Sequence, residues 1–196
     1  MGFSITWFAV PEKNKDEFFK RFGLSLTGEK MDVPDALIST ACLNTGWTLL
    51  WYNKYECPFI GERELADVSK NYDIIRCLVE EHVMACSAEL WSGGSRKWFL
   101  SHEGENGPKG LDSDGDLPKS FNAIKERLEA KQLAEGGESA DTDYIFDIPT
   151  EVAESIVGFK HDVVCKHMPE DVFHVMKRTE TTAPKAGFFA RIFGKK

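Results

Sequence analysis

The chain has 196 residues, of which 42% are hydrophobic and 29% are charged, values that are typical of a folded globular protein. No apolar run approaches the roughly 20 residues that a membrane-spanning helix needs, and the N-terminal stretch lacks the basic and apolar regions of a secretory signal. The five cysteines are scattered and form no C-x-x-C pair, which favours reduced thiols over a disulfide framework or a zinc knuckle. We therefore expect a cytoplasmic protein.

The net charge of −8 is distributed unevenly along the chain. Residues 177–196 contain six basic side chains and one acidic side chain, so this segment carries +5 and residues 1–176 carry −13. An acidic body repels phosphate backbones. The charge distribution therefore argues against nucleic-acid binding through the main surface.

The first part of the chain predicts strands and helices in alternation. The alternation of side chains over residues 3–8 predicts a first strand, and Pro11 then opens a helix with three phenylalanines on one face. Residues 36–43 and 46–53 are rich in strand formers, and the short turn between them predicts a hairpin. Residues 62–72 follow as a short helix, because their apolar side chains recur at helical spacing.

The middle of the chain predicts further strands. Residues 73–82 and 83–91 both have strand composition, with a bend near Glu81. The glycine pair at 93–94 indicates a tight hairpin into the next strand. A long polar loop follows over residues 101–116, with room for one short strand.

The last part of the chain contains the clearest helix. Pro118 opens this helix, and the glycine pair at 136–137 ends it. Residues 143–149 predict a strand that ends at a proline, and residues 150–157 predict a helix with one apolar face. The segment 161–178 is ambiguous between strand and helix.

Short strands in hairpins, with three to four helices packed on them, predict an α+β fold with a mostly antiparallel sheet. The opening order, strand–helix–strand–strand–helix–strand, is compatible with a ferredoxin-like arrangement of the first half. We expect a single α+β domain over residues 1–178, a polar linker over residues 179–187 and a short amphipathic basic-aromatic tail over residues 188–196.

The hairpin around residues 93–94 suggests a partner-binding patch. With a two-residue turn, Trp91 faces Arg96. In the same register Glu89 faces Trp98, so all four side chains share one face. Tryptophan and arginine dominate binding hot spots, so Trp91, Arg96 and Trp98 are candidate partner-binding residues if this face is exposed. The alternative is that a helix covers the face and that Arg96 stacks on a tryptophan for stability.

Three histidines and one cysteine gather near the end of the predicted domain. Imidazole and thiolate groups are ligands that zinc favours. The candidate metal ligands are His161, Cys165, His167 and His174. Neither a strand nor a helix brings all four together, and their spacing matches no zinc signature. The same residues also suit a Cys–His nucleophile pair, and the simplest alternative is a buried cysteine with surface histidines.

No motif in the sequence indicates a particular reaction. There is no glycine-rich phosphate loop, G-x-S-x-G elbow, kinase signature or H-E-x-x-H motif. Carboxylates are plentiful, but no pair is marked out for acid–base catalysis. The sequence therefore predicts no cofactor and no catalytic residue, and it favours a non-catalytic protein over an enzyme.

The chain closes on AGFFARIFGKK, which sets four large apolar side chains among basic ones. On a helix these four side chains share one stripe, while Arg191 and Lys195 lie off it. The stripe consists of Phe188, Phe189, Ile192 and Phe193. Two helical turns are too few to be stable alone in water, so this tail must fold against another surface. The candidate surfaces are a protein partner or another copy of the chain, then the protein's own body, and then, through weak peripheral contact, an anionic membrane.

These observations favour a cytoplasmic, non-catalytic interaction module that engages a protein partner through the tail, including Arg191. One alternative is an acidic neutralising protein, of the antitoxin or immunity type, whose body of charge −13 covers a basic enzyme. A second alternative is a metal- or thiol-dependent enzyme that uses Cys165 with a neighbouring histidine.

Overall fold

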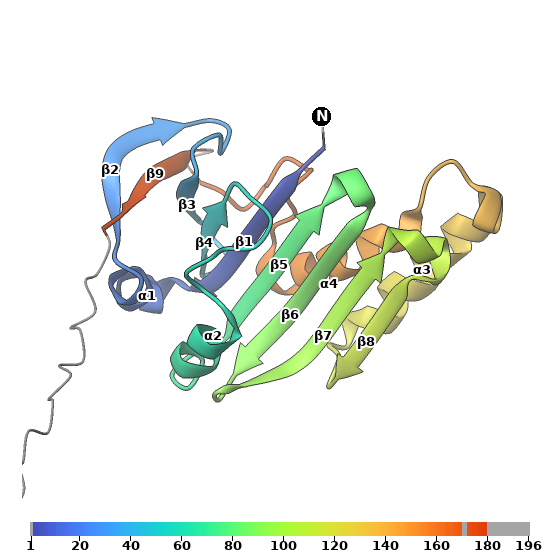
Figure 1. Cartoon of the computed structure of the whole chain (residues 1–196), viewed down its shortest axis with the longest axis horizontal. Coiled ribbons are helices and arrows are strands. Elements are labelled where there is room, and N and C mark those ends of the chain that lie inside the picture. Colours follow the sequence, from blue (N-terminus) through green and yellow to red (C-terminus); the bar gives the residue numbers. More distant parts are fainter. Residues whose placement is uncertain (1, 170–171, 180–196) are drawn as a thin grey trace, which may run out of the picture.

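The computed structural model describes residues 2–169 and 172–179 of the chain, and in these ranges nine strands form one antiparallel sheet (Figure 1). Four α-helices lie against the sheet within the same ranges. The predicted α+β class with an antiparallel sheet is therefore confirmed. Apart from Thr179, the predicted linker and tail over residues 179–187 and 188–196 lie outside the described residues.

The strand order joins the early and late parts of the described chain in one sheet. The strands are β1 (Ser4–Pro11), β2 (Leu24–Met31), β3 (Ile38–Cys42), β4 (Trp47–Tyr52), β5 (Ile74–Glu80), β6 (Ala85–Ser92), β7 (Ser95–Glu103), β8 (Leu111–Gly115) and β9 (Phe173–Arg178). Their order across the sheet is β2-β9-β3-β4-β1-β5-β6-β7-β8, and each neighbouring pair is antiparallel. Because β9 lies between β2 and β3, the end of the predicted domain is part of the same sheet as its beginning.

Helices cover both faces of the sheet. They are α1 (Lys15–Arg21), α2 (Glu62–Val68), α3 (Ser120–Ala134) and α4 (Asp147–Val157). Short 3-10 helices occupy Glu12–Asn14, Glu81–Val83, Gly104–Lys109, Gly137–Ser139 and Tyr144–Phe146. Helices α1 and α2 cover one face, and α3 and α4 cover the other (Figure 1). Within the described ranges, no helix has both the length and the apolar character that a bilayer crossing requires.

Each face of the sheet has its own hydrophobic core, which we call the α1/α2 core and the α3/α4 core. Strand β1 lies near the middle of the sheet, and its side chains alternate between the two cores. Trp7 is buried in the α3/α4 core, and the next residue, Phe8, is buried in the α1/α2 core. This burial on both faces explains why residues 5–10 are almost continuously apolar.

Strand β2 has no counterpart among the predicted elements. Residues 25–30 of this edge strand are all exposed, so no alternation of apolar and polar side chains marks them. Long-range pairing defines the strand instead, and Thr27 Oγ1 donates to the carbonyl of Val175, 148 positions later. With β2 directly after α1, and β1 antiparallel to both β4 and β5, the ferredoxin-like arrangement is not confirmed.

The strand predicted over residues 143–149 is wrong. This stretch forms a 3-10 turn and the first turn of α4, and the Asp143 carboxylate accepts a hydrogen bond from Ile145 N at 3.0 Å. Pro149 fits the first helical turn because backbone N–H groups there have no partner within the helix. Ile148 and Val152 then point into the α3/α4 core at helical spacing. The short apolar run was therefore the start of a helix.

The hairpin at residues 93–94 is confirmed, but its register differs from the prediction. Both glycines have positive φ, 59° and 82°, and Ser92 faces Ser95 across the turn. The register then shifts, so that Leu90 lies opposite Trp98 and β7 contains one extra residue. A one-residue shift turns the following side chains to the other face of the sheet.

The register shift removes the predicted partner-binding patch. Arg96 does face Trp91, but Trp98 is buried in the α3/α4 core while Trp91 is buried in the α1/α2 core. Arg96 interacts with carboxylates instead, at 3.5 Å from Glu89 and 3.6 Å from Glu62. The prediction that Trp91, Arg96 and Trp98 share one exposed face is therefore wrong, because both tryptophans belong to hydrophobic cores.

Candidate functional site

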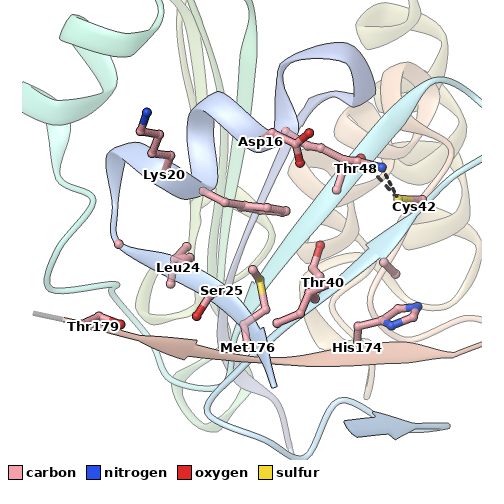
Figure 2. A pocket seen from close by; sticks show the side chains of 15 residues that line it. Asp16, Lys20, Leu24, Ser25, Thr40, Cys42, Thr48, His174, Met176 and Thr179 are labelled. Atoms are coloured by element: carbon pink, nitrogen blue, oxygen red, sulfur yellow. Dashed lines mark hydrogen bonds between the residues drawn. The ribbon is translucent and has the colours of Figure 1, made fainter. Parts of the chain in front are cut away.

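A groove of about 640 Å³ lies beside α1, between this helix and strands β3 and β9 (Figure 2). We call it the α1 groove. Helix α1 and the start of β2 form its walls. Its floor consists of Thr40, Cys42, Thr48, His174 and Met176. The volume is in the range of known ligand pockets, and most of the lining is apolar.

Phenylalanine packing holds α1 in the position that creates the groove. Phe18 is fully buried, and its ring centroid lies 4.9 Å from that of Phe22 and 6.4 Å from that of Phe8 on β1. Phe19, the next residue, is half-buried and lines the groove. The three phenylalanines predicted to share a helix face therefore have two roles: Phe18 and Phe22 anchor the helix, and Phe19 forms an apolar wall.

Two lysines make the rim of the groove positive. Lys15 Nζ lies 3.4 Å from Glu12 Oε1 and 3.4 Å from Cys42 Sγ. Burial alone would lower the pKa of Lys15, but the Cys42 and Glu12 side chains outweigh it and raise the pKa above its ordinary value. Lys15 is therefore charged at neutral pH. Lys20 is exposed and has no ion pair with the described residues, and Asp16 provides the opposing charge on the rim.

The groove is suited to apolar groups because both threonine hydroxyls on its floor already have partners, and Thr48 Oγ1 lies 3.7 Å from Cys42 Sγ. Thr40 Oγ1 donates to the carbonyl of Leu49 at 2.5 Å. No family model, curated protein or solved structure matches this chain. The chemistry of the groove is described by its own lining. An apolar wall with ammonium groups at the rim fits an apolar side chain that is flanked by carboxylates.

The structure separates the four predicted metal ligands. His161 and Cys165 line a second pocket on the α3/α4 side of the sheet, whereas His174 lies in the α1 groove on the other side. His167 is exposed, with Nδ1 2.9 Å from Oδ1 of Asn44. In the part of the chain that the structure describes, no three histidine, cysteine or carboxylate side chains are grouped to hold a metal ion.

A Cys–His–Asp set that the sequence did not reveal lies in the α3/α4 core. Cys86 and His102 are partners on neighbouring strands, and His102 Nε2 lies 2.9 Å from Asp143 Oδ2. The Cys86 thiol donates to the carbonyl of Phe146 at 2.9 Å, and burial raises its pKa well above the ordinary value. A buried, protonated thiol is not a nucleophile. We therefore assign this set a structural role.

Cys42, in the α1 groove, is expected to react with a maleimide faster than the buried cysteines. Cys42 is exposed beside Lys15, whereas Cys77 and Cys86 are buried and burial raises the pKa of both thiols well above the ordinary value. The buried thiols should react at least about 10³-fold more slowly, because unfolding must precede labelling. A timed maleimide pulse read by peptide mass spectrometry checks this, with Cys42→Ser as control. Fast labelling of Cys77 in the folded protein would contradict it.

The predicted tail anchors lie outside the described residues. They are Phe188, Phe189, Arg191, Ile192 and Phe193. The described part of the chain ends at Thr179, and Thr179 lines the α1 groove. The last described residue before these anchors therefore lies at the groove.

Proposed function

We propose that the protein is a non-catalytic protein-interaction module that engages a protein partner through residues 188–196, with the α1 groove as the adjoining surface of the body. One observation supports this proposal: Thr179, from which the chain continues towards those residues, lines the groove. A partner that is held by the basic-aromatic segment would thereby lie next to an apolar groove. The two surfaces together offer more contact than the short segment alone.

The charges of both surfaces favour an acidic partner with apolar side chains. Lys15 and Lys20 lie on the rim of the groove, and residues 177–196 carry a net charge of +5. Carboxylates on the partner would meet both sets of cations, while the aromatic side chains of the segment supply the apolar anchors. The proposal therefore specifies a partner with carboxylates beside exposed apolar side chains.

We place this module in the cytoplasm. Its five cysteines form no disulfide among the described residues, and one of them, Cys42, is exposed. Free thiols persist in reducing compartments, whereas oxidising compartments favour disulfides. The partner is therefore proposed to be another cytoplasmic protein.

Deletion of residues 187–196 is the first test of the proposed function. Proteins captured by the full-length chain are identified, purified and titrated against the full-length and the shortened chain by calorimetry. The deletion should weaken binding by about 100-fold or more, because it removes several aromatic anchors. It should leave the circular dichroism spectrum unchanged, because no described strand or helix includes these residues.

A matched pair of charge reversals tests the groove. Lys20→Glu, on the rim, should weaken binding of the same purified partner by about 5- to 10-fold, since a cation is replaced by an anion. Lys119→Glu makes the same change at an exposed position next to α3, on the other face, and should have little effect. Binding that persists without residues 187–196 and weakens in high salt would instead support the acidic neutralising protein.

A further inference from the structure

A second pocket lies on the opposite side of the sheet from the α1 groove, and we call it the aromatic pocket. It has a volume of about 410 Å³. Its floor includes Phe3, Trp51, Phe159, Met168 and Phe173. The Trp51 ring centroid lies 6.2 Å from that of Phe3, 6.3 Å from that of Phe159 and 6.1 Å from that of Phe173, all in edge-to-face contact. These contacts form a rigid aromatic floor before any ligand arrives.

The rim of the aromatic pocket exposes apolar side chains to solvent. Val33 is 60% exposed, Val163 is 49% exposed and Val164 is 85% exposed. They come from two separate loops, one between β2 and β3 and the other between α4 and β9. Apolar side chains that gather around a pocket are typical of an interaction surface.

Two buried polar atoms of this pocket have no hydrogen-bond partner among the described residues: Trp51 Nε1 and His161 Nδ1. The His161 side chain is 1% exposed, and burial lowers its pKa, so the ring is neutral at pH 7. Its Nε2 lies 3.4 Å from the Glu81 carboxylate, and its Nδ1 lies 4.0 Å from the Asp162 carboxylate. Both ring nitrogens therefore face carboxylates at distances longer than an ordinary hydrogen bond.

Charge distinguishes the aromatic pocket from the α1 groove. Two acidic residues, Asp32 and Asp162, lie on its rim, and the described residues that line it include no lysine or arginine. Asp162 is already paired with Lys160 at 2.9 Å, so Asp32 supplies the larger part of the negative charge of the rim. The rim of the α1 groove carries Lys15 and Lys20. A segment that is both aromatic and basic is therefore attracted to the aromatic pocket and repelled by the groove.

We propose that the aromatic pocket binds residues 188–196 of a second copy of this chain. This inference rests on the proposed function and identifies the partner. The phenylalanines of that segment match the aromatic floor and the valine rim, and its basic side chains, Arg191, Lys195 and Lys196, match Asp32. The overall body charge of −13 adds a long-range attraction for a segment of charge +5.

Distance favours a second copy over the chain's own tail. The pocket lies at the Phe173 end of β9, and Thr179 follows the other end, about 20 Å away at the rise of a strand. Thr179 also lines the groove of the opposite face, so the chain would have to cross a layer about 10 Å thick. The nine steps from Thr179 to Phe188 span at most about 30 Å when fully extended. Phe188 would therefore reach the pocket of its own chain only with the linker fully extended, whereas a second copy requires no such extension.

Reciprocal binding of residues 188–196 between two copies would limit the assembly to a dimer. Each copy would donate residues 188–196 and accept them in its own aromatic pocket, which produces a two-fold symmetric dimer. The second contact forms at a high effective concentration, so two weak contacts produce one stable dimer.

Sedimentation velocity of the full-length chain over a range of concentrations tests the inference. The chain should dimerise, and Val164→Lys should raise the dimer dissociation constant by about 10-fold or more, since it removes a rim contact and adds a repelling charge. Leu133→Lys makes a comparable change at a leucine of α3 that is 77% exposed and lines neither the aromatic pocket nor the α1 groove, and it should leave the constant within about 2-fold. Both side chains are exposed, so neither substitution is expected to disturb folding.

Mixing two defective variants tests exchange between copies directly. The Val164→Lys chain retains its tail, and the chain that lacks residues 187–196 retains its pocket. Each should be monomeric alone, and together they should form a one-to-one complex in a tagged pull-down. Three results would overturn the inference: a dimer dissociation constant that Val164→Lys leaves unchanged, a constant that Leu133→Lys raises as much as Val164→Lys does, or a monomer with no complex in the mixture. A monomer that still binds a different purified partner through residues 188–196 would leave the proposed function standing.

Discussion

Replacement of Glu89 by alanine is expected to lower the free energy of unfolding by about 3–5 kcal/mol. Glu89 is fully buried, and its Oε1 lies 2.6 Å from Arg76 Nε and 2.6 Å from Trp91 Nε1. Removal of the carboxylate leaves the mostly buried Arg76 guanidinium without its partner and the Trp91 N–H without an acceptor. A loss of this size is a large fraction of the 5–15 kcal/mol that stabilises a typical domain.

Urea unfolding followed by circular dichroism measures this loss. Glu62→Ala is the matched control, because Glu62 is an exposed partner of Arg96 at 3.6 Å and exposed ion pairs contribute about 0–1 kcal/mol. Glu89→Gln should fall between the two, since the amide oxygen still accepts from Trp91 while the charge is lost. Equal unfolding midpoints for Glu89→Ala and Glu62→Ala would show that the buried network contributes little.

Replacement of Phe18 by alanine is expected to cost about 3–5 kcal/mol as well. Phe18 is fully buried, and its ring contacts those of Phe8, Phe19 and Phe22. The substitution leaves a cavity under α1, a helix of 7 residues that has few other anchors in the α1/α2 core. The α1 groove should loosen together with the helix, because α1 forms one of its walls.

Phe19→Ala, on the same helix as Phe18→Ala, is expected to affect partner binding more than the free energy of unfolding. Phe19 is half-buried, so its loss should cost roughly 1 kcal/mol. It lines the groove, however, and its removal should weaken partner binding while most of the stability remains. Urea unfolding and calorimetric titration of both variants test this division. The assignment of Phe18 to the core fails if Phe19→Ala is the more destabilising substitution.

Local patterns in the sequence predicted the helices and turns whose signals lie within a few consecutive residues. The phenylalanines after Pro11 predicted α1, and the glycine pair at 93–94 predicted the turn between β6 and β7. The helix after Pro118 and the α+β class were predicted in the same way. These features follow from periodicity, turn residues and proline positions, all of which act over a few residues.

The candidate sites could be predicted only in part. Of the lining of the α1 groove, the sequence marked Phe19, as one aromatic residue of an amphipathic helix, and His174, as a candidate metal ligand. Most of the lining outside α1 comes from β2, β3, β4 and β9, which are far apart in the chain. The aromatic pocket likewise joins Phe3 with Trp51 and residues 159–173. No local spacing links such residues, because strand pairing brings them together.

The sequence alone determined the α+β class, the tight turn at 93–94 and the contrast between an acidic body and a basic end. The tertiary structure decided that β9 pairs with β2, that Trp91 and Trp98 belong to different cores, and that Glu89 is buried. The physical reason is the range of the interactions involved. Composition and periodicity act locally, whereas one extra residue in β7 reverses the faces of the side chains that follow. Only the long-range pairing of strands sets that register.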